Sequence, residues 1–161
     1  RDVLSYLWAS KIMEYAPRSR YCELIVNGSY EGIYVLTEKI KRNKNRVNIK
    51  KLDPTIISGD ELTGGYIIKL DKETGDDAFT WQSSYYSASG SPVKPLFQVD
   101  YPNAANINDA QRNYIRSFID SLEYAMNSSS YTDPNLGWRK YIDEESLISF
   151  IITNELAKNG D

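Results

Sequence analysis

The sequence has 161 residues, a formal net charge of −3 and no histidine; 41% of its residues are apolar and 25% are charged. This composition is typical of a globular domain, and the lack of histidine excludes Ser-His-Asp chemistry, Cys-His chemistry and His-ligated metal sites within the chain. The acidic balance gives no reason to expect nucleic-acid binding in general.

The first elements that the sequence predicts are a helix and a β-hairpin. Apolar residues at helix spacing predict a helix over residues 2–16, which Pro17 ends. Strand-like runs over 21–26 and 33–40 lie on either side of a turn that begins Asn27-Gly28. An Asn-Gly pair between two β-rich runs favours a hairpin.

A basic segment follows the hairpin. Seven of the thirteen residues from Lys39 to Lys51 are Lys or Arg, and within this segment Val47 and Ile49 alternate with polar residues. A basic run invites a nucleic-acid interpretation, but it lacks interleaved aromatic residues and the chain is acidic overall. We therefore expect a solvated edge strand that resists aggregation; contact with an acidic protein substrate stays open.

The middle of the chain predicts a sheet. Residues 64–70 are predicted to form a central strand, and residues 71–95, rich in Asp, Ser, Tyr, Gly and Pro, a loop or a loose hairpin. Leu96 to Val99 is predicted as a last short strand. No apolar run approaches the ~20 residues that cross a bilayer, so we expect no membrane span.

Two helices complete the chain. Asn108 and Gln111 form a capping-box pattern at the start of the first. The second begins near Asp143, whose side chain can cap it, and ends before Asp161, which we place on the loop beyond the helix. The order of a helix, antiparallel strands and then helices indicates an α+β fold.

Three segments of the sequence, taken together and in order, resemble the CotH kinase family, the group of spore coat protein H and its bacterial relatives. The segments are Asn27-Gly28-x-Tyr30-x-Gly32-x-Tyr34-x-Leu36-x-Glu38-Lys39-Ile40, then Gly64-Gly65-Tyr66-Ile67-Ile68-Lys69-Leu70-Asp71-Lys72, and finally Asn154-Glu155-Leu156-x-Lys158-Asn159-x-Asp161. Their spacing spans nearly the whole chain.

This resemblance implies a protein-kinase-like fragment, with an antiparallel β-sheet lobe followed by helices of the second lobe. We expect a single partial domain over residues 1–161, with the N-terminal helix and β-rich lobe at about 1–107 and the start of a truncated helical lobe at about 108–161. The resemblance also implies ATP and Mg²⁺, both expected for the full-length parent only, and phosphate transfer to Ser hydroxyls of an exported or coat protein. The location it suggests is extracellular or in the cell envelope.

The resemblance assigns roles to three residues. Asp161 matches the Asn-x-Asp element, whose Asp is the catalytic base, and Lys69 is the best match for the Lys that binds nucleotide phosphates. Glu38 matches the glutamate of the first segment, which either orients a Lys or serves structurally. The family's Asn-aromatic strand and its metal-holding Trp-Asp-x-Asp motif have no counterpart here, so no metal ligand is assigned.

The same three residues also have plain interpretations. By strict alternation Glu38 shares a strand face with Tyr34 and Leu36; if that face is the core, Glu38 needs a cationic partner, for which Lys69 is a candidate. Otherwise Glu38 is a strand-end surface residue. Lys69 can simply extend to solvent, and Asp161 can be a solvated terminal residue.

Two functions therefore stay open. The first is an atypical kinase that phosphorylates a protein substrate and is inactive as truncated, because the metal motif is missing. The second is a non-catalytic structural or binding module of the cell envelope or the extracellular space on the same scaffold. A cut domain exposes apolar surface, so a dimer through the truncated face would be an artefact.

Overall fold

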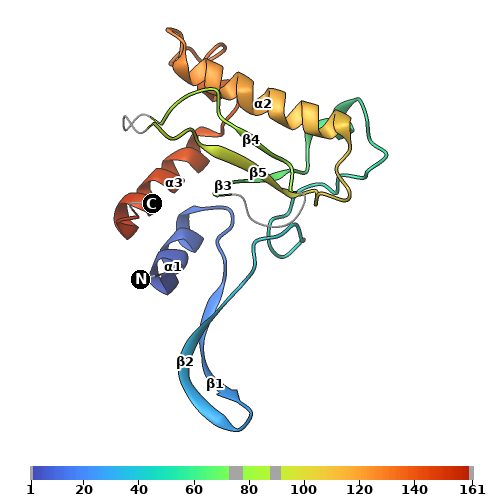
Figure 1. Cartoon of the computed structure of the whole chain (residues 1–161). Coiled ribbons are helices and arrows are strands. Elements are labelled where there is room, and N and C mark those ends of the chain that lie inside the picture. Colours follow the sequence, from blue (N-terminus) through green and yellow to red (C-terminus); the bar gives the residue numbers. More distant parts are fainter. Residues whose placement is uncertain (1, 73–77, 88–91, 160–161) are drawn as a thin grey trace. The chain divides into compact units, whose positions relative to one another are not determined.

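The computed structural model describes residues 2–72, 78–87 and 92–159 (Figure 1). The described residues form two compact units. Unit 1 comprises those of Arg1–Lys41, Asn45–Val47 and Ile142–Asp161, and unit 2 comprises those of Arg42–Lys44 and Asn48–Tyr141. Small antiparallel sheets and three α-helices confirm the α+β class. The grouping cuts across the predicted boundary near residue 107, and the kinase-like division into two lobes stays a prediction.

The hairpin of unit 1 is formed by β1 (Ser19–Val26) and β2 (Ser29–Thr37) (Figure 1). Its two-residue turn places Asn27 and Gly28 at φ of 51° and 83°, the left-handed pair that twists with the strands of a hairpin. The register shifts by one residue between Leu24 and Ile25. The predicted hairpin is therefore confirmed, with a bulge that the sequence did not indicate.

Two helices accompany the hairpin in unit 1. Helix α1 (Asp2–Ile12) packs against α3 (Glu144–Ala157). The predicted extension of the first helix to residue 16 is wrong, because the chain must turn into β1 and the residue before Pro17 is kept out of helical conformation. The predicted cap of α3 is confirmed, since the Asp143 carboxylate accepts from the backbone N–H of Ser146 at 2.8 Å.

Unit 1 leaves many apolar side chains exposed. Tyr34 and Leu36, on one face of β2, are 48% and 67% exposed, so this face of the hairpin is not a core face. The large exposed side chains of α3 include Phe150 and Ile151. A two-stranded hairpin is only marginally stable by itself, so its position depends on contacts at its base.

The sheet of unit 2 has three antiparallel strands, β3 (Ile67–Leu70), β4 (Thr80–Gln82) and β5 (Leu96–Tyr101), in the order β3-β5-β4. The prediction that residues 64–70 form a central strand is wrong, because β5 lies between the other two. β4 falls within the segment predicted as a loop or loose hairpin.

The core of unit 2 lies between this sheet and α2 (Asp109–Asn127). Trp81 and Phe97 are cross-strand partners whose rings stack at 5.3 Å between centroids. Val99 lies two residues beyond Phe97 and so on the same face, where Ile115 of α2 joins the cluster of buried residues. The apolar side chains on one face of the sheet and on one face of α2 thus form a single apolar layer.

A polar anchor joins the start of α2 to a loop more than fifty residues earlier in the chain, at Asp53 and Ile56. Gln111 is fully buried, and its side-chain amide donates to the carbonyl oxygens of Asp53 at 2.7 Å and Ile56 at 3.1 Å. Its side-chain oxygen accepts from the backbone N–H of Asn108 at 3.2 Å, while the Asn108 side chain accepts from the backbone N–H of Gln111 at 2.9 Å. The predicted capping box is therefore confirmed.

The basic segment does not form the predicted edge strand. Val47 makes a single bridge, with its N–H 3.4 Å from the carbonyl oxygen of Lys41, and Ile49 lies in no strand. Several of its cations pair locally, among them Lys50 with Glu61. None of the helices in the part of the chain that the structure describes has the length and hydrophobicity needed to cross a bilayer.

Candidate functional site

Glu38 lies at the end of β2, where two arginines bind its carboxylate. Arg18 donates from Nη2 to Oε1 at 2.6 Å and from Nε to Oε2 at 3.1 Å, so the two side chains meet in a bidentate pair. Arg46 donates from Nε to Oε1 at 2.8 Å. The backbone N–H of Arg18 adds a longer bond to Oε2 at 3.3 Å. The Glu38 side chain is only 7% exposed, so a carboxylate shielded from water is bound by two cations.

These contacts set the charge state of the cluster. Hydrogen bonds from the Arg18 side chain and backbone, and the charges of Arg18 and Arg46, lower the pKa of Glu38 from 4.5 to about 2. The buried hydroxyl of Tyr15 faces the same carboxylate, and burial followed by the charge of Glu38 raises the pKa of that phenol. Among the described residues this hydroxyl makes no hydrogen bond of ordinary geometry. Glu38 is therefore ionised and Tyr15 neutral at physiological pH.

The bonding pattern limits what Glu38 can do chemically. A carboxylate offers about four acceptor positions, and the four N–H donors of Arg18 and Arg46 occupy them. In this arrangement Glu38 joins the base of the hairpin to the basic segment. Lys69, its predicted partner, belongs to unit 2, and the pairing of Glu38 with Lys69 stays a prediction.

The bulge in the hairpin explains why Arg18 meets Glu38. Next to the turn, Val26 pairs with Ser29, and an uninterrupted ladder from there would place Glu38 opposite Pro17. The one-residue shift between Leu24 and Ile25 changes the partner by one, so the N–H of Glu38 donates to the carbonyl oxygen of Arg18 at 2.9 Å. Sequence reasoning did not find Arg18, Arg46 and Tyr15 as neighbours of Glu38.

Lys69 lies on β3, directly opposite Gln98 of the central strand β5. The residue is partly buried, and β3 is an edge strand, so the ladder fixes the backbone of Lys69 on one side. Gly65 precedes the strand at a φ of +85° and passes close to the backbone of Lys50. The pairing with Gln98 and the close approach of Gly65 to the backbone of Lys50 therefore fix the backbone path into and along β3 at Lys69.

The end of α3 holds the chain just before Asp161. The side-chain amide of Asn159 donates to the side-chain oxygen of Asn154 at 3.0 Å, and its backbone N–H donates to the carbonyl oxygen of Asn154 at 3.1 Å. Lys158 adopts the left-handed conformation, with φ 51° and ψ 43°, a common way to end a helix. Asp161 itself lies outside the described residues, so its predicted role stays a prediction.

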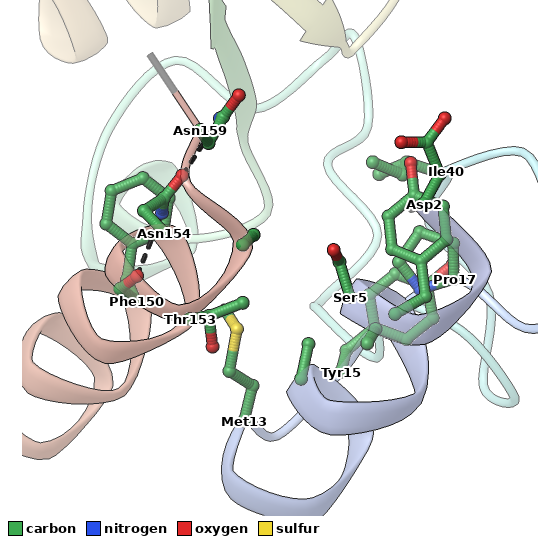
Figure 2. Close-up of a pocket in the computed structure, with 14 residues that line it drawn as sticks. Asp2, Ser5, Met13, Tyr15, Pro17, Ile40, Phe150, Thr153, Asn154 and Asn159 are labelled. Atoms are coloured by element: carbon green, nitrogen blue, oxygen red, sulfur yellow. Dashed lines mark hydrogen bonds between the residues drawn. The ribbon is translucent and has the colours of Figure 1, made fainter. Parts of the chain in front are cut away.

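A cavity of about 390 Å³ lies in unit 1 between α1 and this helix end. Figure 2 shows Phe150, Thr153, Asn154 and Asn159 on its α3 side. The opposite wall carries Asp2, Ser5, Met13, Tyr15, Pro17 and Ile40. Its volume falls in the range of small-molecule sites. The Asn154–Asn159 cap thus lies at the edge of a mostly apolar cavity.

No metal site can be assigned from the described residues. They contain no group of three or more His, Cys, Asp or Glu side chains placed to hold a metal ion.

A family model described as CotH kinase protein matches residues 1–161. No curated protein matches the chain, and no solved structure matches it.

Proposed function

This chain belongs to the CotH kinase family, and on that basis we propose that it forms part of a kinase-like phosphotransferase. The proposed reaction transfers the γ-phosphate of ATP to Ser hydroxyls of an exported or coat protein. In that reaction the Ser oxygen forms a bond to the γ-phosphorus, the bond from that phosphorus to the bridging oxygen breaks, and ADP leaves. Asp161 accepts the hydroxyl proton, and Lys69 binds the phosphates.

The observation that carries this proposal is the Asn154–Asn159 cap. A catalytic base must lie within hydrogen-bond reach of the proton that it accepts, and a side chain on a loop meets that demand only if a rigid element holds the loop. Two hydrogen bonds fix Asn159 to the last turn of α3, two positions before Asp161. The cap anchors the described chain at Asn159, which lines the cavity of unit 1, and this anchor supports the proposal for Asp161.

Lys69 supplies the charge that this chemistry needs. Its ammonium group would interact with phosphate oxygens as a point charge, and the ladder contact with Gln98 holds its backbone in register. When bound, Mg²⁺ would neutralise further phosphate charge; none of the described residues is assigned to it. Catalysis on this proposal comes from positioning and charge stabilisation.

One observation favours a second function, a non-catalytic structural or binding module of the cell envelope or the extracellular space. Glu38, the carboxylate expected to orient a Lys, is already fully engaged by Arg18 and Arg46. A signature glutamate used as a structural anchor is compatible with a scaffold that keeps the fold without the chemistry. Nucleotide binding separates the two functions.

The test is calorimetric titration of ATP with Mg²⁺ into the natural polypeptide that carries this chain. Lys69→Ala should weaken ATP binding about ten-fold or more, because it removes a charge-assisted contact. Lys44→Ala, which removes the same charge from an exposed residue of unit 2, is the matched control and should leave the affinity within about two-fold. Equal affinities in the two variants contradict the role of Lys69, and no ATP binding at all supports the scaffold.

A further inference from the structure

We propose that a cationic groove at the base of the β1–β2 hairpin binds a phosphoserine-bearing segment of the protein substrate. The inference rests on the proposed function, because that function produces phosphoserine. It adds a docking site and a substrate preference: serines near an already phosphorylated serine would be favoured.

The groove has a volume of about 400 Å³ and lies wholly within unit 1. The side chains that matter for the argument are Arg18, Arg20, Leu36, Glu38, Lys39 and Arg46. Lys69, the residue proposed to bind the nucleotide phosphates, does not line it. Ligand binding in this groove can therefore be measured separately from nucleotide binding.

Charge is the first argument for an anionic ligand. Four cations and one carboxylate line the groove, an excess of three positive charges. The single carboxylate, Glu38, is already neutralised by Arg18 and Arg46. Arg20 and Lys39 are exposed and make no ion pair or side-chain hydrogen bond with any of the described residues. A ligand with a double negative charge would relieve this imbalance.

The unused donors are the second argument. Arg18 donates to Glu38 through Nε and Nη2, and Arg46 donates to Glu38 through Nε and to the carbonyl oxygen of Lys39 through Nη1. Within the described chain, Nη1 of Arg18 and Nη2 of Arg46 keep their N–H groups free. Glu38 already holds both guanidinium groups in place. The two arginine side chains therefore lose less conformational entropy when a ligand binds them.

The third argument concerns the kind of anion and its carrier. Guanidinium groups bind phosphate oxygens through two parallel hydrogen bonds, and phosphoserine carries nearly two charges at pH 7, whereas Asp or Glu carries one. Leu36, 67% exposed in the same groove, offers an apolar contact to a peptide that inorganic phosphate cannot use. The combination fits a phosphate group carried on a peptide.

The test is fluorescence anisotropy of labelled Ser-containing peptides with the natural polypeptide, without ATP. Three peptides differ at one position, which is phosphoserine, Asp or Ser. We expect the phosphoserine peptide to bind about ten-fold or more tightly than the Ser peptide, with the Asp peptide between them. Raising the salt concentration should weaken binding of the phosphoserine peptide most. Its phosphate carries the most negative charge, and salt screens charged contacts near the surface.

Charge-matched variants locate the binding site. Arg20→Ala and Lys39→Ala should each weaken the phosphoserine peptide about three- to five-fold. Lys11→Ala removes the same charge from an exposed position of α1 outside the groove and should change the affinity less than about two-fold. Because neither Arg20 nor Lys39 bonds through its side chain to the described residues, these variants should keep the fold.

Three outcomes would overturn the inference: equal binding of the phosphoserine and Ser peptides, equal binding of the phosphoserine and Asp peptides, or equal losses in the groove variants and Lys11→Ala. Competitive displacement of the peptide by ATP would also overturn it, by assigning the groove to nucleotide. Phosphopeptide binding without phosphate transfer would support the groove and contradict the proposed function. Phosphate transfer with no preference for the phosphopeptide would contradict the groove alone.

Discussion

Arg18 and Glu38 form a bidentate ion pair across the base of the β1–β2 hairpin, with Nη2 to Oε1 at 2.6 Å and Nε to Oε2 at 3.1 Å. Arg46, from the basic segment, donates to the same carboxylate at 2.8 Å. The pair joins the last residue before β1 to the first residue after β2. It therefore closes the hairpin and organises the cationic groove at the same time.

The first prediction concerns the charge of Glu38. Glu38→Gln should lower the Tm of the protein by about 2–4 °C, because it leaves Arg18 and Arg46 facing each other without the carboxylate that separates them. Glu31→Gln makes the same substitution at an exposed position of β2 and should have little effect. Thermal unfolding followed by circular dichroism gives both values. Equal Tm values for the two variants would show that the ion pair contributes nothing to stability.

The second prediction concerns pH. The pKa of Glu38 falls from 4.5 to about 2 on folding, chiefly through its hydrogen bonds with Arg18. A lowered carboxyl pKa stabilises the folded state above pH 4.5, and this contribution is lost as the pH falls from 4.5 to about 2. The difference in unfolding free energy between the wild type and Glu38→Gln should therefore shrink across that interval. A difference independent of pH would contradict the ionised pair.

Local patterns predicted the elements of unit 1 better than its contacts. The Asn27-Gly28 turn and the Asp143 cap depend on neighbouring residues, and both are found as predicted. The partners of Glu38 depend on a bulge between Leu24 and Ile25, which brings Arg18 opposite it, and on Arg46, eight residues after Glu38 in the sequence. Neither alternation nor charge pattern specifies a one-residue shift of register, so sequence reasoning did not find Arg18 and Arg46.

The third prediction tests the buried anchor of unit 2. Gln111→Leu keeps the approximate size of the side chain but leaves the N–H of Asn108 without its partner and removes one of the two hydrogen bonds that the carbonyl oxygen of Asp53 accepts, which should cost about 1–3 kcal/mol. Asn113→Leu, on an exposed position of the same helix, should change stability by less than about 0.5 kcal/mol. Urea unfolding measures both. A small loss in Gln111→Leu would mean that the loop re-forms its hydrogen bonds elsewhere.

The fourth prediction concerns the entry to β3. Gly65 has a φ of +85°, and a Cβ there would lie 2.4 Å from the carbonyl oxygen of Lys50. Gly65→Ala should therefore destabilise the protein by at least about 1–2 kcal/mol more than Gly64→Ala, because Gly64 has a φ of −124° and open space around its Cβ position. Chemical unfolding of the two variants compares them directly. Equal stability would contradict the close passage of these two backbone segments.

The order of strands in unit 2 shows a second limit of sequence reasoning. The apolar run ending at Leu70 marks a strand, but the same run is compatible with a central or an edge position. β5 lies between β3 and β4 because it pairs with both, a property of three segments together. The site residues have the same limit. The family resemblance identified Lys69 and Asp161 as candidates; Lys69 lies on β3 of unit 2, and Asp161 lies outside the described residues.

The central claim is that Asp161 acts as the base of a phosphotransferase, and its most direct test is phosphate transfer from ATP to a Ser-containing peptide by the natural polypeptide. Asp161→Asn should lower the rate of transfer by about 10²–10⁴-fold while leaving the affinity for ATP unchanged. Asp100→Asn, at an exposed position of β5, should keep the wild-type rate. An Asp161→Asn protein that transfers phosphate as fast as the wild type would contradict the account.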